Sequence, residues 1–212
     1  MVSIYACQIH NIKMTKEAIR ERLSPERLDQ VGRFRPDDTL RSLAGDLLVL
    51  HALRENGYNL THLPSYAITK QGKPSLPDYP DFQFNVSHSG KWAVCAISCQ
   101  PVGIDIQQER TIKPALITRT LTKRETEYLN SQPASIRQTV FFDYWCLKEA
   151  YLKATGTGLT VPLQSIEIDL ENTTLSDAAY QIQLPAFPEI HYHIGLCCQE
   201  HLSGPVVIKN LG

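Results

Sequence analysis

Hydrophobic residues recur at helical spacing in two long stretches of the chain. In residues 40–53 and 139–155 they fall three or four positions apart, and a glycine closes each stretch, as is typical of helix ends. Each stretch therefore predicts a long helix. A shorter helix is expected to begin at Ser24 and Pro25, because serine caps helices and proline fits the first helical position.

Short stretches of alternating or continuous apolar residues predict strands. They are residues 84–87, 92–98, 102–107, 166–170, 180–184 and 191–198. Residues 71–82 hold one glycine and three prolines and are expected to form a loop. Each half of the chain thus combines one long helix with several strands, which predicts an α+β fold of two similar α/β halves. We place the division between residues 1–101 and 102–212.

Composition and charge exclude several classes of function. The 212 residues are 42% hydrophobic, enough for a substantial core, and 21 basic residues nearly balance 22 acidic ones. We therefore expect no general affinity for nucleic acid or for an anionic membrane. No stretch approaches the roughly 18 apolar residues of a membrane span, and the first residues do not resemble a signal peptide, so a cytoplasmic protein is expected. The six cysteines form no C-x-x-C pair and are expected to be reduced and mostly buried.

Two polar residues share one face of the predicted strand 102–107. Asp105 and Gln107 alternate with apolar neighbours, and their Cα atoms are expected to be about 7 Å apart. Both side chains carry oxygen, the ligand atom that Mg²⁺ prefers. From the pattern alone, a strand whose polar face is simply wet is the commoner case.

The second long helix places an acid and a base on one face. Glu149 and Lys153 are one turn apart. They are either directed together into a site or form an exposed ion pair, and taken alone the ion pair is the commoner case.

Other polar residues also allow two interpretations. The segment Asn-Val-Ser-His-Ser-Gly at residues 85–90 joins two predicted strands, either as a phosphate-binding loop or as an ordinary turn. His88 is accordingly a phosphate contact or a loop histidine, and a lysine such as Lys73 is usually solvated. His191 and His193 share a strand face, but without a third ligand we do not expect a zinc site.

Four motifs occur along the chain in one order. They are Gly-Lys-Pro at residues 72–74, Asn-x-Ser-His-Ser-Gly at 85–90, Gly-Ile-Asp-Ile at 103–106 and Trp-x-x-Lys-Glu-Ala-x-x-Lys-x-x-Gly-x-Gly-Leu at 145–159. Together they resemble the 4′-phosphopantetheinyl transferases of the Sfp type, over about residues 33–162. The resemblance implies two halves related by pseudo-twofold symmetry, with the active site in the cleft between them. It also implies transfer of 4′-phosphopantetheine from coenzyme A to a serine of an apo acyl or peptidyl carrier protein, with release of 3′,5′-ADP and dependence on Mg²⁺.

The resemblance implies roles for individual residues. Asp105 and Glu149 match metal ligands, Gln107 stands at the position of a third, and Glu149 also matches the base that takes the proton of the carrier serine. Lys153 matches a catalytic contact to the pyrophosphate of coenzyme A. Further coenzyme A contacts are implied for Lys73, Ser87, His88, Arg41, Ser42 and Arg27.

Gln107 departs from many members, which have Gly-x-Asp-x-Glu here. Glutamine offers only a neutral carbonyl oxygen or a hydrogen bond to metal-bound water, so weaker Mg²⁺ binding is expected. Glu109 is expected about 13 Å from Asp105, too far to replace the missing carboxylate.

Three functions are compared on these grounds. The first is an active transferase for carrier domains of peptide, polyketide or fatty-acid synthesis. The alternative is a coenzyme A or carrier-protein binding protein whose catalysis is impaired by Gln107, although retention of Glu149, Lys153 and His88 argues against it. A magnesium-dependent phosphatase finds no supporting motif.

The resemblance also bears on assembly and on the carrier. A monomer suffices, because one chain supplies both halves of the cleft. The carrier is expected to dock on apolar surface beside the cleft, with residues 112–132 as a candidate, although Leu116, Leu121 and Leu129 could equally face the core.

Overall fold

The computed structural model describes residues 1–12, 18, 21–33, 36–200 and 208–210. Up to residue 98 the elements are β1 (Ser3–Gln8), η1 (Ile9–Asn11), α2 (Pro25–Gly32), α3 (Pro36–Glu55), β2 (Ala67–Ile68), β3 (Pro74–Ser75), β4 (Gln83–Ser89) and β5 (Trp92–Ser98). From residue 102 they are β6 (Val102–Gln108), α4 (Pro114–Thr120), α5 (Lys123–Ser131), α6 (Arg137–Thr155), η2 (Gly158–Thr160), η3 (Leu163–Ser165), β7 (Ile168–Asp169), β8 (Thr174–Leu175), β9 (Gln181–Gln183), β10 (Tyr192–Cys198) and β11 (Ile208–Asn210).

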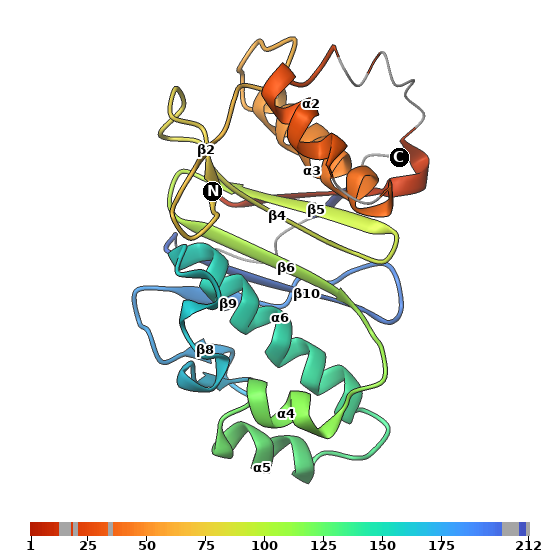
Figure 1. Cartoon of the computed structure of the whole chain (residues 1–212). Helices are drawn as coiled ribbons and strands as arrows, with labels where there is room; N and C mark the ends of the chain where they lie inside the picture. Colours follow the sequence, from red (N-terminus) through yellow and green to blue (C-terminus); the bar gives the residue numbers. More distant parts are fainter. Residues whose placement is uncertain (13–17, 19–20, 34–35, 201–207, 211–212) are drawn as a thin grey trace.

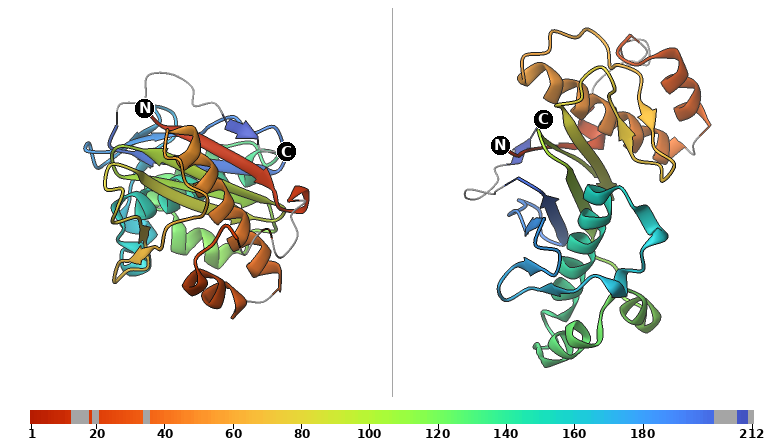
Figure 2. Two further views of the ribbon diagram at one scale, coloured as in Figure 1. Left: turned by 90° about the horizontal axis from the view of Figure 1, so that it is seen from above. Right: turned by 90° about the vertical axis from the view of Figure 1, so that its left-hand side faces the viewer.

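Two sheets pack face to face, and a long helix covers the outer face of each (Figure 1). The first sheet has the strand order β11-β1-β5-β4 and the second has the order β6-β10-β9. Within both sheets neighbouring strands are antiparallel, except that β11 runs parallel to β1. Figure 2 shows α3 and α6 on opposite sides of the two sheets.

The two halves have the same topology. In the first, β1 is followed by α3, β4 and β5, and the sheet order is β1-β5-β4. In the second, β6 is followed by α6, β9 and β10, and the sheet order is β6-β10-β9. The predicted α+β fold of two similar halves is confirmed. The division after residue 101 falls between β5 and β6 and stays a proposal, and β11 returns from the end of the chain to the first sheet.

Three hydrophobic clusters fill the interfaces between the layers, which are α3, the two sheets and α6. One lies between α3 and the first sheet and includes Leu48 and Phe84. The second lies between the two sheets, where Val94 of β5 and Ile104 of β6 are fully buried. The third packs α6 and its neighbours against the second sheet, with Leu147 at 0% exposure. No helix in the described ranges is long and apolar enough to cross a membrane.

Two glycines let α6 lie directly on the second sheet. A Cβ on Gly103 of β6 would overlap the backbone of Ala150 and Ala154, and a Cβ on Gly195 of β10 would overlap the backbone of Cys146. Both glycines therefore serve close approach of helix and sheet.

Several predicted elements are confirmed. The helix beginning at Pro25 is present, with Ser24 Oγ accepting from the Arg27 N–H at 3.3 Å. The helix predicted for residues 139–155 is α6, which ends at Gly156 in the left-handed conformation. The helix predicted for residues 40–53 is α3 and is longer than expected. Five of the six cysteines are buried and none forms a disulfide.

Other expectations were wrong. Residues 88 and 89, which were predicted to link two strands, belong to β4 together with the predicted strand 84–87, because β4 pairs with β5 up to Ser89 and only a tight turn at Gly90, with a positive φ of 53°, separates the strands. The predicted loop 71–82 contains the short strand β3, which pairs with β2. The strand predicted at 166–170 is only β7, which pairs with β8 in a separate hairpin and not in the second sheet.

The close packing of α6 gives a first prediction. Gly195→Ala should lower the free energy of unfolding by about 1–3 kcal/mol, because rigid backbone atoms of α6 must move to admit a methyl group. Urea denaturation of the two proteins measures the change. Gly32→Ala is the control, since nothing lies within 4 Å of a Cβ at Gly32. Equal stability of the two variants would contradict the packing argument.

Candidate active site

The edge strands of the two sheets, β4 and β6, lie side by side and are joined through side chains of β4. Three bonds make this connection: the Ile104 N–H donates to Asn85 Oδ1 (2.9 Å), the Ile106 N–H to Ser87 Oγ (3.3 Å) and the Gln108 N–H to Ser89 Oγ (3.0 Å). Each donor follows its acceptor by 19 residues, so the two strands run in the same direction. We call these three bonds the β4–β6 ladder.

The Ser87 hydroxyl is the centre of a polar network on this ladder. It donates to Asp105 Oδ1 at 2.7 Å and accepts from Lys153 Nζ at 2.9 Å. Its remaining acceptor position takes the Ile106 N–H. A hydroxyl has one donor and two acceptor positions, so a direct contact of the Ser87 hydroxyl with another molecule has to replace one of these bonds.

Asp105 is surrounded by donors and is only 2% exposed. Lys153 Nζ lies 2.6 Å from Asp105 Oδ1 and also donates to the Ile104 carbonyl at 3.1 Å. The Gln107 amide donates to Asp105 Oδ2 at 3.1 Å. Asp105 and Gln107 therefore meet as the strand pattern predicted. The amide nitrogen faces Asp105 because an ionised carboxylate only accepts hydrogen bonds.

Glu149 lies one turn before Lys153 on α6 and is half-buried. The helix spacing favoured an ion pair between the two, but Lys153 is paired with Asp105. The Glu149 carboxylate has no hydrogen-bond or ion-pair partner among the residues that the structure describes. Burial raises the pKa of Glu149, the negative charge of Asp105 raises it further, and Lys153 opposes both. A carboxylate without a partner thus lies beside a second carboxylate.

The oxygen atoms of Asp105, Glu149 and Gln107 are of the ligand type that a magnesium ion prefers. No group of three or more His, Cys, Asp or Glu side chains in the described part of the chain is placed to hold a metal. Asp105 and Glu149 supply two carboxylates, with the Gln107 amide beside them. Mg²⁺ usually takes one or two carboxylates and completes its shell with water and substrate phosphates. A cation here would stabilise the charged form of Glu149, which burial and the neighbouring Asp105 charge disfavour.

His88 faces the opposite side of β4 from Ser87, toward α3. Loss of surrounding water lowers its pKa, and the positive charges of Lys153 and Arg41 lower it further. Arg41 of α3 donates to the Gly90 carbonyl at 3.4 Å, at the end of the same strand. The structure thus brings His88 and Arg41 close to the β4–β6 ladder.

Arg27 and Ser42 form a separate cluster on α2 and α3. Arg27 donates to Ser42 Oγ at 2.6 Å and to Asp46 Oδ2 at 2.9 Å. The guanidinium also lies over the Tyr66 ring, 5.6 Å from its centroid. Arg27 and Ser42 are thus fixed to each other, with no bond to Asp105 or Lys153.

Lys73 is not a solvated loop lysine. Its ammonium donates to the Ala154 carbonyl at 2.9 Å and the Val102 carbonyl at 3.4 Å, and burial lowers its pKa. A cation at this end of α6 also interacts favourably with the helix dipole. Lys73 therefore joins the first half of the chain to the second.

A mainly apolar pocket of about 580 Å³ opens beside Glu149. Its lining consists of Leu116, Arg119, Thr120, Trp145, Glu149, Val161, Pro162, Leu163 and Gln164. Trp145 Nε1 and Thr120 Oγ1 are buried without a hydrogen-bond partner in the described ranges. The predicted docking region 112–132 contributes Leu116 to this pocket, whereas Leu121 and Leu129 face the core at 3% exposure.

A buried ion pair holds the walls of this pocket. Lys148, next to Glu149, lies 2.5 Å from Glu125, and both side chains are at most 1% exposed. The same ammonium donates to the carbonyls of Thr120 and Leu163, which belong to two walls of the pocket. Glu125 also accepts from the Ile168 N–H at 2.9 Å. All these polar groups are satisfied, as a buried pair requires.

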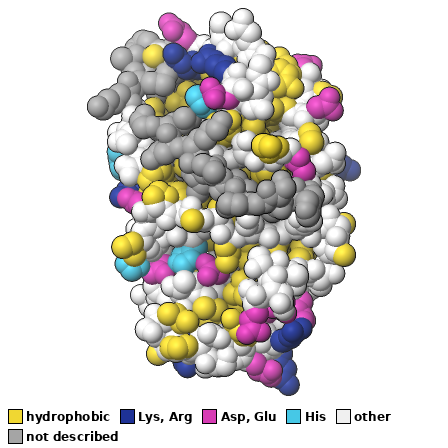
Figure 3. All heavy atoms as spheres, turned by 180° about the vertical axis from the view of Figure 1, so that it is seen from behind, with side chains coloured by type: hydrophobic (Ala, Val, Ile, Leu, Met, Phe, Trp, Pro, Cys, Tyr) yellow, Lys and Arg dark blue, Asp and Glu magenta, His cyan; other side chains and the backbone are white. Residues whose placement is uncertain are grey.

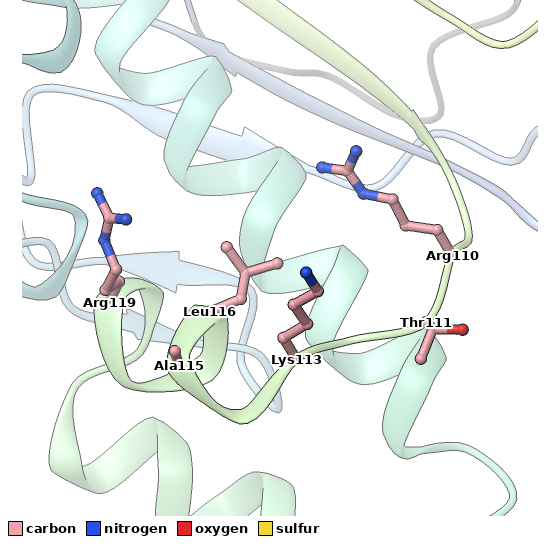
Figure 4. Close-up of a pocket in the computed structure, with 6 residues that line it drawn as sticks. All are labelled: Arg110, Thr111, Lys113, Ala115, Leu116 and Arg119. Atoms are coloured by element: carbon pink, nitrogen blue, oxygen red, sulfur yellow. The ribbon is translucent and has the colours of Figure 1, made fainter.

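A basic pocket of about 340 Å³ adjoins the apolar one through Leu116 and Arg119 (Figure 4). Arg110 and Lys113 reach it from the segment before α4, and Arg119 from α4 itself. None of these three cations has an ion-pair partner among the described residues. The surface around α4 therefore combines positive charge with apolar area.

Two family models match the chain. Residues 12–101 match the model described as "4'-phosphopantetheinyl transferase, N-terminal", and residues 101–200 match the "4'-phosphopantetheinyl transferase superfamily". The 4'-phosphopantetheinyl transferase Sfp of Bacillus subtilis (strain 168) is 34% identical over 165 residues, which cover 77% of this chain and 71% of that protein. The chain belongs to the 4′-phosphopantetheinyl transferases. The predicted family and enzyme class are confirmed.

Two further curated relatives agree with this assignment. The transferase is 34% identical to the 4'-phosphopantetheinyl transferase psf-1 of Bacillus pumilus over 194 residues, which cover 87% of this chain and 80% of that one. It is 33% identical to the L-aminoadipate-semialdehyde dehydrogenase-phosphopantetheinyl transferase of Mus musculus over 169 residues, 70% of this chain and 53% of that one. Among solved structures, the Thermotoga maritima holo-[acyl-carrier-protein] synthase aligns with 46% of this chain and 61% of its own, at 21% identity and a TM-score of 0.39.

The sequence analysis missed several residues that build the candidate site. No individual role was predicted for Asn85 or Ser89, and neither Lys148 nor Glu125 was singled out. A signal for the first two existed, because residues 85, 87 and 89 are polar at every second position, as on one face of a strand. The pairing of Lys148 with Glu125 has no such local signal, since 23 residues separate them.

A second charged cluster lies at the other end of β6. His193 contacts Asp143 Oδ1 through Nδ1 at 2.7 Å and Glu109 Oε1 through Nε2 at 2.9 Å. Histidine and acidic side chains adjoin on the back of the molecule (Figure 3). Burial lowers the pKa of His193, but the bonds to Asp143 and Glu109 outweigh burial and raise it overall. Both ring nitrogens can donate only in the protonated form.

The transferase should therefore lose stability as His193 deprotonates. A histidine with a raised pKa in the folded state stabilises fully below its unfolded pKa of about 6.5 and loses this contribution as pH rises through the folded value. The difference in unfolding free energy between wild type and His193→Gln should be largest near about pH 6 and shrink toward about pH 9. Urea titrations at several pH values measure it. His62→Gln, at an exposed histidine without an ion pair among the described residues, is the control, and a difference independent of pH would refute the assignment.

Proposed function

We propose that the chain transfers the 4′-phosphopantetheine group of coenzyme A to a serine of an apo acyl or peptidyl carrier protein and releases 3′,5′-ADP. The observation that carries this proposal is the Glu149 carboxylate, which has no partner among the described residues and lies beside the Asp105–Lys153–Ser87 network. Membership in the 4′-phosphopantetheinyl transferases supports the reaction itself.

The chemical step requires a base for the attacking hydroxyl. The carrier serine Oγ forms a bond to the β-phosphorus of coenzyme A, and the bond from that phosphorus to the bridging oxygen breaks, so that 3′,5′-ADP leaves. The serine proton passes to Glu149. A half-buried carboxylate with a raised pKa suits this role, because a base works best when its pKa approaches the working pH.

Positive charge must neutralise the pyrophosphate and the leaving group. Lys153 supplies one charge at the β4–β6 ladder and needs only to turn from Asp105 toward the phosphates. Asp105 and Glu149 would hold Mg²⁺, with Gln107 as a weak third donor, and the ion would neutralise phosphate charge. The bond from the Ser87 hydroxyl holds Asp105 in place.

The residues around the ladder suit binding of coenzyme A. We assign His88 and Arg41 to its phosphates, since both lie on the α3 side of β4 near Lys153. Lys73 is a contact at the end of α6. Arg27 and Ser42 would bind as one preformed unit, because Asp46 fixes the guanidinium.

The carrier protein is assigned to the surface around α4. The apolar pocket beside Glu149 offers area for an apolar contact, and the basic pocket lined by Arg110, Lys113 and Arg119 suits acidic side chains. This surface narrows the predicted docking region to Leu116 and its neighbours. One chain supplies all these groups, so we also propose that the enzyme acts as a monomer.

The direct test is transfer to an apo carrier protein. Incubation with coenzyme A and Mg²⁺ should increase the mass of the carrier by one phosphopantetheine group. A serine-to-alanine carrier is the control and should gain nothing. The absence of a mass gain on every carrier in a panel, with any divalent metal, would refute the function. Release of phosphate without a carrier would point to a phosphatase.

Replacing the proposed base should separate catalysis from binding. Glu149→Gln should reduce kcat by about 10²–10⁴-fold, while the affinity for coenzyme A, measured by titration calorimetry, changes much less. Glu127→Gln, at a side chain 68% exposed on α5, is the control and should behave as wild type. Equal losses in kcat and in coenzyme A affinity would mean that Glu149 acts mainly in binding.

The alternative function, a binding protein impaired by Gln107, is tested at that residue. In an active enzyme, Gln107→Glu should lower the Mg²⁺ concentration that gives half-maximal transfer, because a third carboxylate beside Asp105 and Glu149 binds the ion more tightly. Calorimetric titration with Mg²⁺ checks the affinity independently of activity. An inactive wild type that becomes active on this substitution would favour the impaired binding protein.

A further inference from the structure

We infer that Asn85 is a positioning residue of the transferase, which holds the strand that carries Asp105 against the strand that carries Ser87 and His88. The inference rests on the proposed transfer reaction and adds to it the residue that fixes the distance between the two sides of the site.

The contact of Asn85 places it next to the reacting groups but not among them. Asn85 is 6% exposed, and its Oδ1 accepts the Ile104 N–H at 2.9 Å. The carbonyl of the same residue, Ile104, accepts from Lys153 Nζ, and Asp105 is the next residue in the chain. One side-chain amide therefore fixes the backbone segment that bears Asp105 and receives Lys153.

The bond is needed because β6 is an edge strand. Its other edge pairs with β10, so the N–H groups of residues 104, 106 and 108 point toward β4. A buried N–H without an acceptor is strongly unfavourable. Asn85 and Ser87 supply buried acceptors, whereas the bond of Ser89 is exposed.

Among the three bonds of the β4–β6 ladder, the bond to Asn85 can be removed without changing a side chain that contacts the reacting groups. Ser87 also contacts Asp105 and Lys153, so its loss changes several groups at once. Among the described residues, Asn85 meets this network only through the backbone of Ile104. Its removal should let β6 move away from β4, while His88 and Arg41 stay on the first half. Catalysis should then suffer more than coenzyme A binding.

Gln83 offers a matched control on the same strand. It lies two residues before Asn85 and on the same face of β4, but its amide donates to the Pro80 carbonyl at 2.8 Å. Asn85→Leu removes the acceptor at nearly constant size, and Asn85→Asp keeps an oxygen at the same place. Gln83→Leu makes the same kind of change without a bond to β6.

The experiment compares these three variants with wild type in the carrier-transfer assay, together with amide exchange at Ile104 followed by NMR. Asn85→Leu should lower kcat by about 10- to 100-fold, with a smaller change in KM for coenzyme A, and should speed exchange at Ile104. Asn85→Asp should restore most of kcat and most of the slow exchange at Ile104. Gln83→Leu should match wild type in kcat and in exchange.

Three outcomes would overturn the inference. They are a folded Asn85→Leu protein with wild-type kcat, an Asn85→Asp protein as impaired as Asn85→Leu, and unchanged exchange at Ile104. If the wild type modifies no carrier, the proposed function fails instead, and the exchange data still decide whether Asn85 holds β6.

Discussion

The arrangement of the two sheets depends on the N–H groups at one edge of β6, which need hydrogen-bond acceptors. One edge of β6 pairs with β10, and its other edge presents N–H groups to β4. The side chains of Asn85, Ser87 and Ser89 meet that demand where β4 offers no backbone partner. Because side chains bridge the two strands, the sheets meet at their edges without merging into one. The polar site lies where these edges come together.

Charge balance at this place depends on the same geometry. Lys153 reaches between β4 and β6 and neutralises Asp105, so the acid that shares its helix face, Glu149, stays without a partner among the described residues. Glu149 and Lys153 have the spacing of an ion pair on a helix surface, but the tertiary contact of Lys153 with Asp105 replaces that pair. The buried ions Lys148 and Glu125 pair directly with each other instead, and the Lys148 ammonium also binds the carbonyls of Thr120 and Leu163 in two walls of the apolar pocket.

The duplicated topology explains why so much of the architecture was accessible from the sequence. Each half needs one amphipathic helix and three strands, and the helical periodicity of residues 40–53 and 139–155 was clear. The predicted strand 84–87 ended too early because small polar residues look alike in turns and on a strand face that bonds to a neighbouring strand. Their polarity was interpreted as a turn signal, although pairing with β5 makes the segment a strand.

The sequence by itself determined the two-half α+β fold, the family, and the proximity of Asp105 to Gln107, because these depend on local periodicity and on motifs of fixed order. Only the tertiary structure decided which charges pair. Lys153 pairs with Asp105 and not with Glu149. Arg27 binds Ser42 and Asp46, away from the β4–β6 ladder. Such choices depend on distances between residues tens of positions apart in the chain, and no local pattern records them.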